Sequence, residues 1–180
     1  MMLCNKFQTP IDVCHYMSSL VPHGCSHILE PTPGVGNLKN ILLSYGYNVT
    51  SPEDFFLLPS NSRFDCVVMN PPFSEKSALL QHAPSFYQGS GMKVGYYILQ
   101  EAMNMSDHVI ALMPWFTISD SDVRLRCLLN FGLQSVTLLE RKTFNYTRIQ
   151  TCILVLSKGF RGTSSFQYFS TLIAADVAKK

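Results

Sequence analysis

Charged side chains are scarce in this sequence: Asp, Glu, Lys and Arg make up 14% of its 180 residues, against roughly 25% in an average soluble domain. Hydrophobic residues reach 47%, which excludes an intrinsically disordered chain and leaves apolar surface for a ligand or partner. Long hydrophobic runs are also lacking, because the longest one, residues 109–118, is interrupted by Pro114 and Thr117. That run is about half as long as a membrane span requires. We therefore expect a soluble protein.

The six cysteines form no C-x-x-C pair, and no charged and then apolar leader opens the chain. We therefore expect a reducing, cytoplasmic environment. Some metal-ligand residue types do lie close together in the sequence, but their spacing is not that of the usual ligand sets. These residues are Cys14, His15, His23, Cys25 and His27. We expect no bound metal, and no Ser-His-Asp or Cys-His set is indicated.

Repeats, linkers and low-complexity tracts are absent as well, and 180 residues suit one domain with a sizeable core. We expect residues 1–180 to form that single domain. Apolar runs and amphipathic stretches alternate along it, and this alternation predicts a doubly wound α/β sheet that is mostly parallel and seven-stranded. The last two strands are close enough in sequence to pair, so the last strand is expected to be antiparallel. The expected strands are 27–30, 47–50, 55–58, 64–69, 109–113, 134–139 and 149–156.

Helices are predicted over 10–20, 37–44, 93–105 and 121–130, with Asn37 as the N-cap of the second. Residues 74–91 show no clear periodicity and are expected to form a loop. Charge is uneven along this plan: residues 1–123 carry five basic and ten acidic residues, whereas 124–180 carry nine and two. A basic C-terminal part suits a polyanion, although a solvated basic face is an equally good interpretation.

Ligands of doubly wound sheets bind at the carboxyl ends of the strands, and two unusual segments are predicted there. The first runs from Glu30 to Gly36, where Gly34 and Gly36 allow a tight bend and a close approach to a ligand. Lys39 replaces the third glycine of a dinucleotide fingerprint, and no phosphate-binding G-K-S/T follows. Taken alone, this segment is as consistent with a plain turn as with a cofactor loop.

The second segment, Asn70-Pro71-Pro72-Phe73, directly follows the apolar run 64–69. Two prolines remove two N–H donors and leave carbonyl groups at the end of a buried strand, where a ligand can donate to them. The Asn70 side-chain oxygen and the Pro71 carbonyl can accept both hydrogens of one amino group, while Phe73 offers a face to a planar ring. Such acceptors aim the nitrogen lone pair at an electrophile. These four residues are the predicted catalytic motif; the plain alternative is a proline-rich turn.

Asn-Pro-Pro-Phe resembles the catalytic motif of the S-adenosylmethionine-dependent adenine-N6 DNA methyltransferases. Other segments of the chain resemble further motifs of that family and stand in the family's order. Thr9-Pro10 resembles its N-terminal cofactor motif, Glu30 to Gly36 its glycine loop, and residues 53–56 the acidic-aromatic motif that meets the cofactor's adenine. Residues 143–154 resemble the late motif whose aromatic contacts the flipped base. The match covers about residues 7–158.

The resemblance implies S-adenosylmethionine as cofactor and DNA as substrate, with RNA as an alternative. The implied cofactor-binding residues are Thr9, Pro10, Glu30, Pro31, Gly34, Gly36, Asp54, Phe55 and Asn70. Phe73 and Phe144 are the implied contacts to the base. The basic residues that flank Phe144, namely Arg141, Lys142 and Arg148, are placed to contact the nucleic-acid backbone, and a solvated hairpin is the alternative for them.

Two departures from the family bear on these expectations. The second strand usually ends in an acidic residue that binds the ribose, whereas here Ser51-Pro52 follow it, so either the contact is absent or Glu53 takes it. The family's DNA-reading domain normally follows the late motif, and only 22 residues remain after Lys158. We therefore expect a catalytic domain without a separate target-recognition domain. Such a domain should methylate a short or degenerate site unless a partner chain supplies recognition.

Three other functions remain open at this point. Glutamine-amide protein methyltransferases share Asn-Pro-Pro with an aromatic residue, but they usually carry a helical substrate domain before the glycine loop, and 29 residues precede Glu30 here. An RNA adenine methyltransferase and a non-catalytic nucleic-acid-binding subunit that keeps the fold are the other two.

Overall fold

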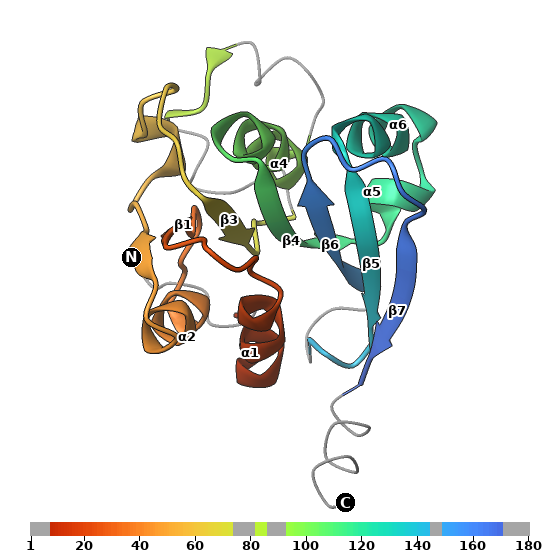
Figure 1. The fold of residues 1–180 in the computed structure, drawn as a ribbon, viewed down its shortest axis with the longest axis horizontal. Helices are drawn as coiled ribbons and strands as arrows, with labels where there is room; N and C mark the ends of the chain where they lie inside the picture. The colour runs from red at the N-terminus through yellow and green to blue at the C-terminus, as the bar shows by residue number, and fades with distance from the viewer. Residues whose placement is uncertain (1–7, 74–81, 86–92, 145–148, 171–180) are drawn as a thin grey trace, which may run out of the picture.

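The computed structural model describes residues 8–73, 82–85, 93–144 and 149–170, which build a seven-stranded sheet with helices on both faces (Figure 1). The strands are β1 (His27–Leu29), β2 (Asn48–Thr50), β3 (Cys66–Met69), β4 (His108–Pro114), β5 (Leu133–Leu139), β6 (Thr151–Ser157) and β7 (Ser165–Phe169). The helices are α1 (Ile11–Ser19), α2 (Asn37–Ser44), α4 (Val94–Met105), α5 (Phe116–Ser119) and α6 (Asp122–Phe131).

The strand order is β2-β1-β3-β4-β6-β5-β7. β6 pairs antiparallel with both of its neighbours, and the remaining pairs are parallel, so β6 alone runs against the other six strands. The predicted seven-stranded, mostly parallel α/β sheet is thereby confirmed. The antiparallel strand is β6 and not the last strand, because β7 follows it and runs parallel to β5.

The central strands are buried on both faces, as their continuous apolar sequences predict. In β3, Val67 and Met69 belong to the cluster that packs under α4 and α6, whereas Cys66 and Val68 belong to the cluster under α1 and α2. β4 alternates in the same way along its length. This three-layer packing fixes the register of the strands and therefore the position of every loop that leaves their carboxyl ends.

Three local expectations differ from the structure. Residues Phe55–Leu57 form a 3-10 helix and no strand, because the Asp54 side chain accepts a hydrogen bond from the Phe56 N–H at 2.9 Å and closes a turn there. The strand β7 was not expected; it is short, and four of its five residues are exposed. The N-cap of α2 is Gly36, with φ +95°, and Asn37 is the first residue of the helix.

No helix in the described part of the chain is both long enough and apolar enough to cross a membrane.

Gly132, at the junction of α6 and β5, provides a test of this packing. Its φ is +139°, and a Cβ there would lie 2.0 Å from the Ser157 carbonyl oxygen and 2.9 Å from the Phe160 nitrogen. Gly159 also has a positive φ, +81°, but nothing lies within 4 Å of its Cβ position. We expect Gly159→Ala to lower the free energy of unfolding by ~1–2 kcal/mol through backbone strain, and Gly132→Ala by ~2–5 kcal/mol through strain plus overpacking. Urea denaturation measures both, and equal losses would contradict this account.

Candidate functional site

The carboxyl ends of β1, β3 and β4 lie at one edge of the sheet because these strands are parallel neighbours. The loop after β1 begins with Glu30, and the loop after β3 begins with Asn70. Between them opens a polar pocket lined by Gln8, Thr9, Glu30, Thr32, Pro33, Leu38 and Asn70. The structure therefore brings together three predicted site residues, Thr9, Glu30 and Asn70, from distant parts of the sequence.

Glu30 is a buried carboxylate at this pocket, with 1% of its surface exposed. Its Oε1 accepts a hydrogen bond from the Thr32 N–H at 3.2 Å, and its Oε2 accepts one from the Ser51 hydroxyl at 3.1 Å. Burial raises the pKa of Glu30 from 4.5 to about 7, although these two hydrogen bonds and the charge of Lys39 oppose the shift. A cationic group bound beside Glu30 would favour its ionised form.

Ser51 occupies the place after β2 where the family usually has an acidic residue. Its hydroxyl lies 3.1 Å from both the Glu30 carbonyl oxygen and Glu30 Oε2. Ser51 therefore supports the buried carboxylate, and Glu53, the other predicted candidate for a ribose contact, is exposed.

The glycine loop is held from outside by the segment that precedes α1. Gln8 Oε1 accepts from the Val35 N–H at 3.1 Å, and the Asn37 side-chain amide donates to the Thr9 carbonyl at 3.0 Å. Gly34 has φ +55°, and a Cβ there would lie 2.5 Å from Gln8 Nε2. The left-handed backbone therefore disfavours a side chain at Gly34, and the Gln8 side chain would have to move to admit one. Pro31, at the start of the loop, is buried.

Asn70 is bound through both its side chain and its main chain. Its Nδ2 donates to Thr9 Oγ1 at 2.9 Å, and its carbonyl oxygen accepts from the Thr32 hydroxyl at 3.2 Å. The following loop packs closely against α4, because a Cβ on Gly95 would lie 2.7 Å from the Pro72 carbonyl oxygen. The first turn of α4 therefore fixes the main chain between Pro71 and Phe73.

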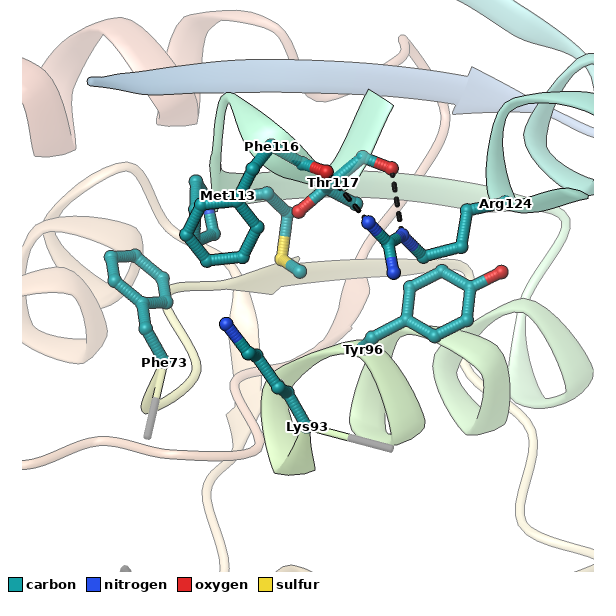
Figure 2. Close-up of a pocket in the computed structure, with 9 residues that line it drawn as sticks. Phe73, Lys93, Tyr96, Met113, Phe116, Thr117 and Arg124 are labelled. Atoms are coloured by element: carbon teal, nitrogen blue, oxygen red, sulfur yellow. Dashed lines mark hydrogen bonds between the residues drawn. The ribbon is translucent and has the colours of Figure 1, made fainter. Parts of the chain in front are cut away.

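Phe73 lines a second pocket, of about 120 Å³, which is called the aromatic pocket below because three rings contribute to it (Figure 2). Tyr96 and Phe116 contribute further rings, and Met113 at the end of β4 contributes its thioether. Rings arranged in this way can hold a planar group by stacking. The motif therefore separates a polar pocket, which contains the buried carboxylate, from an aromatic one.

Two cations border the aromatic pocket, and the sequence analysis identified neither. The Lys93 ammonium lies 4.1 Å from the centre of the Phe116 ring. Arg124 donates from Nε to the Thr117 carbonyl at 3.1 Å and from Nη2 to the Phe116 carbonyl at 2.8 Å, as Figure 2 shows. Both residues lie at the starts of helices, α4 and α6, that follow strands β3 and β4. This position was the signal by which the sequence could have placed them near the site.

Several other predicted residues lie away from these pockets. Asp54 caps the 3-10 helix and contacts His82, and Phe55 is 2% exposed within the core under α4. Phe144 is 6% exposed and packs in the core cluster that contains α1. Arg141 and Lys142 are exposed after β5, and Arg148 lies outside the described residues. The predicted roles of all these residues stay predictions.

No family model and no curated protein matches the sequence. Solved structures, in contrast, match nearly the whole chain. The modification subunit of a putative type I restriction enzyme from Vibrio vulnificus matches with a TM-score of 0.68 and 18% identity, over 92% of this chain and 47% of that one. The methyltransferase subunit of a type I restriction-modification system from Streptococcus thermophilus matches with a TM-score of 0.71 and 16% identity, over 97% and 52%.

A putative class I S-adenosylmethionine-dependent methyltransferase from Listeria monocytogenes matches with a TM-score of 0.69 and 15% identity, over 99% of this chain and 72% of that one. This chain has the fold of the class I methyltransferases. It spans about half the length of the Vibrio and Streptococcus subunits, at 47% and 52%.

The buried carboxylate predicts a pH-dependent stability. Between the unfolded pKa of 4.5 and the folded pKa of about 7, the native state binds more protons at Glu30 than the unfolded chain does. The free energy of unfolding should therefore fall as the pH rises through this window, by about 3 kcal/mol in total from this group. Glu30→Gln removes this pH-dependent contribution. Urea denaturation should therefore show that the free energy of unfolding of the variant rises relative to that of the wild type from about pH 5 to about pH 8. The exposed Glu53→Gln is the control, and a pH-independent difference for Glu30→Gln would contradict the assignment.

Proposed function

We propose that this chain is the catalytic part of an S-adenosylmethionine-dependent DNA methyltransferase that methylates the exocyclic N6 of adenine. The observation that carries the proposal is the position of Asn70-Pro71-Pro72-Phe73, between the polar pocket of Glu30 and the aromatic pocket of Phe73. The class I methyltransferase fold supports it, as do matched structures that are subunits of restriction-modification systems.

The residues of the polar pocket suit the amino-acid end of S-adenosylmethionine. The Glu30 carboxylate offers an anionic partner for an ammonium group, and the positive φ of Gly34 lets the loop turn tightly after Pro33, which lines the pocket. The predicted holding residues are Thr9, Pro10, Glu30, Pro31, Gly34, Gly36 and Asn70, with Asp54 and Phe55 toward the adenine. When bound, this cofactor supplies an electrophilic methyl group on a sulfonium sulfur.

On the substrate side, Asn70 and Phe73 orient the amino group that accepts the methyl. The Asn70 side-chain oxygen and the Pro71 carbonyl accept its two N–H groups, and Phe73 stacks on the ring. This arrangement favours a pyramidal nitrogen whose lone pair forms the new N–C bond, and the nitrogen then loses one proton to water. No general base is needed before transfer. A paired adenine must be flipped out of the duplex to reach this position.

Tyr96 and Phe116 line the aromatic pocket beside Phe73 and supply the other ring contacts to the base. Phe144 is the predicted late-motif contact, and it must leave its core packing to reach the base because it is 6% exposed.

A methyl-transfer assay with tritiated S-adenosylmethionine tests the proposal directly. Duplex DNA, single-stranded DNA, RNA and a glutamine-containing peptide are offered in parallel, and nucleoside analysis of the product identifies the methylated atom. We expect N6-methyladenine in DNA. Transfer to RNA alone or to the peptide alone would replace the DNA assignment. Absence of both cofactor binding and transfer would leave the chain a non-catalytic subunit.

Asn70→Ala should lower the methyl-transfer rate by about 100-fold or more, because one preorganised polar contact to a reacting group is worth ~2.7–4 kcal/mol. Thermal unfolding should show a folded variant. Asn130→Ala, at an exposed position of α6, controls for the substitution and should keep the wild-type rate. Wild-type turnover by the Asn70 variant would overturn the mechanism.

We also propose that DNA is bound mainly through phosphate contacts, with base-specific recognition supplied by a partner chain. Arg141 and Lys142 follow β5 and lie at the same edge of the sheet as the candidate site, since β5 runs in the direction of β4. Contacts to phosphate position a protein on DNA but carry no direct sequence information. Binding by this chain alone should therefore be weak and steeply dependent on salt.

Replacing Arg141 and Lys142 together by glutamine should reduce the slope of log affinity against log salt concentration by ~2, about 0.9 for each lost phosphate contact. Fluorescence anisotropy with a labelled duplex measures the slope. Lys158→Gln is the control, because Lys158 follows β6, at the opposite edge of the sheet, and pairs with Asp107 at 3.0 Å. An unchanged slope in the double variant would remove these two residues from the DNA interface.

A further inference from the structure

The side chain of Asn70 is anchored by a residue that lies 61 positions earlier in the chain. Its Nδ2 donates to Thr9 Oγ1 at 2.9 Å. Because the carboxamide group is planar, its oxygen Oδ1 is then turned away from Thr9. In the structure the amide nitrogen is the atom that faces Thr9. A threonine hydroxyl can both donate and accept, so the contact restrains the position of the carboxamide.

Thr9 is itself held rigidly, as a positioning group must be. It is 4% exposed, and its carbonyl oxygen accepts from the Asn37 side-chain amide at 3.0 Å and from the Cys14 thiol at 3.6 Å. Pro10, the N-cap of α1, follows it directly and fixes the main chain there. The main chain of Thr9 is thus tied both to the first turn of α2 and to α1.

The motif needs an external anchor of this kind. Pro71 and Pro72 have no N–H groups, so the loop that follows β3 cannot be held by main-chain donors at these two positions. The Thr32 hydroxyl, 3.2 Å from the Asn70 carbonyl oxygen, holds the main chain of Asn70. Thr9 is the residue seen to hold its side chain by the amide nitrogen.

We infer that Thr9 is a positioning residue whose hydroxyl restrains the Asn70 carboxamide at the place where it meets the substrate amino group. Loss of the hydroxyl removes this restraint. The geometric part of this inference stands on the contact alone, whereas its catalytic consequence rests on the proposed function. It is a role different from holding the cofactor, for which the sequence resemblance named Thr9.

Kinetics with two Thr9 variants separate the two roles. Thr9→Val keeps the shape but removes the hydroxyl, and Thr9→Ser keeps the hydroxyl. If Thr9 positions Asn70, Thr9→Val should lower kcat at saturating cofactor and DNA by ~10- to 100-fold, since small misplacements of a reacting group have effects of this size. Thr9→Ser should retain most of kcat. If Thr9 only holds the cofactor, Thr9→Val should raise the KM for S-adenosylmethionine and leave kcat unchanged, which would overturn the inference.

Thr137→Val is the matched control for loss of a buried hydroxyl. Thr137 is 1% exposed and its Oγ1 lies 2.9 Å from the Tyr16 hydroxyl, within β5 and away from the motif. Thr137→Val should lower the free energy of unfolding, as Thr9→Val does, but leave kcat at the wild-type value. In the Asn70→Ala background, Thr9→Val should lower kcat no further, because the group that it positions is gone.

A readout that needs no activity comes from the side-chain amide signal of Asn70 in the ¹⁵N-labelled protein. The signal is assigned by its loss in Asn70→Asp. We expect its protons to exchange slowly with water in the wild type and in Thr9→Ser, and faster in Thr9→Val. Unchanged exchange in Thr9→Val would overturn the inference even if the wild type methylates DNA. Protected exchange in a protein that methylates no polymer would instead keep the anchor and reject the proposed function.

Discussion

Two adjacent prolines at the end of a buried strand impose the constraint on which the candidate site depends. Pro71 and Pro72 cannot donate hydrogen bonds, so the loop after β3 has to be positioned by groups from elsewhere in the chain. Those groups come from the segment before α1, from the glycine loop and from the first turn of α4, where Gly95 leaves room for the Pro72 carbonyl. The Asn70-Pro71-Pro72-Phe73 motif is therefore held in place by contacts from its surroundings.

The same contacts join the motif to the polar pocket. Thr32 donates through its hydroxyl to Asn70 and through its main-chain N–H to Glu30, and Glu30 in turn accepts from Ser51. With Thr9, which accepts from the Asn70 side chain, four segments of the chain thus meet in one set of hydrogen bonds at the carboxyl edge of the sheet. A change at one member of such a set is felt by the others, since buried polar networks act as a unit.

Much of the fold could be predicted from the sequence because its strongest signals are local. The run of apolar residues before Asn70 required a strand buried on both faces, and the glycines and prolines marked the loops. The strand β7 was missed because it is a short edge strand whose aromatic side chains, Phe166 and Tyr168, are 63% and 55% exposed and take no part in the core. Residues 55–57 were predicted to be a strand, but the hydrogen bond from the Phe56 N–H to the Asp54 side chain closes a 3-10 turn there.

The candidate site was predictable only in part. Glu30, Thr9 and Asn70 stood out by residue type and motif, and the parallel strands bring them together. Lys93 and Arg124 stand at the starts of helices that follow β3 and β4, but their contribution to the pocket depends on where α4 and α6 dock, which is set by tertiary packing. The burial of Phe144 likewise depends on the cluster under α1, far from it in the sequence.

The raised pKa of Glu30 has a thermodynamic consequence for any ligand that places a cation beside it. Near neutral pH the carboxyl group, with a pKa of about 7, is only partly ionised. Binding of a cation completes the ionisation and releases a fraction of a proton to the solution. The heat measured by calorimetry then includes the ionisation heat of the buffer that takes up this proton. Titrations in phosphate and in Tris, whose ionisation heats differ, would give different apparent enthalpies at the same affinity, and their difference counts the protons released at Glu30.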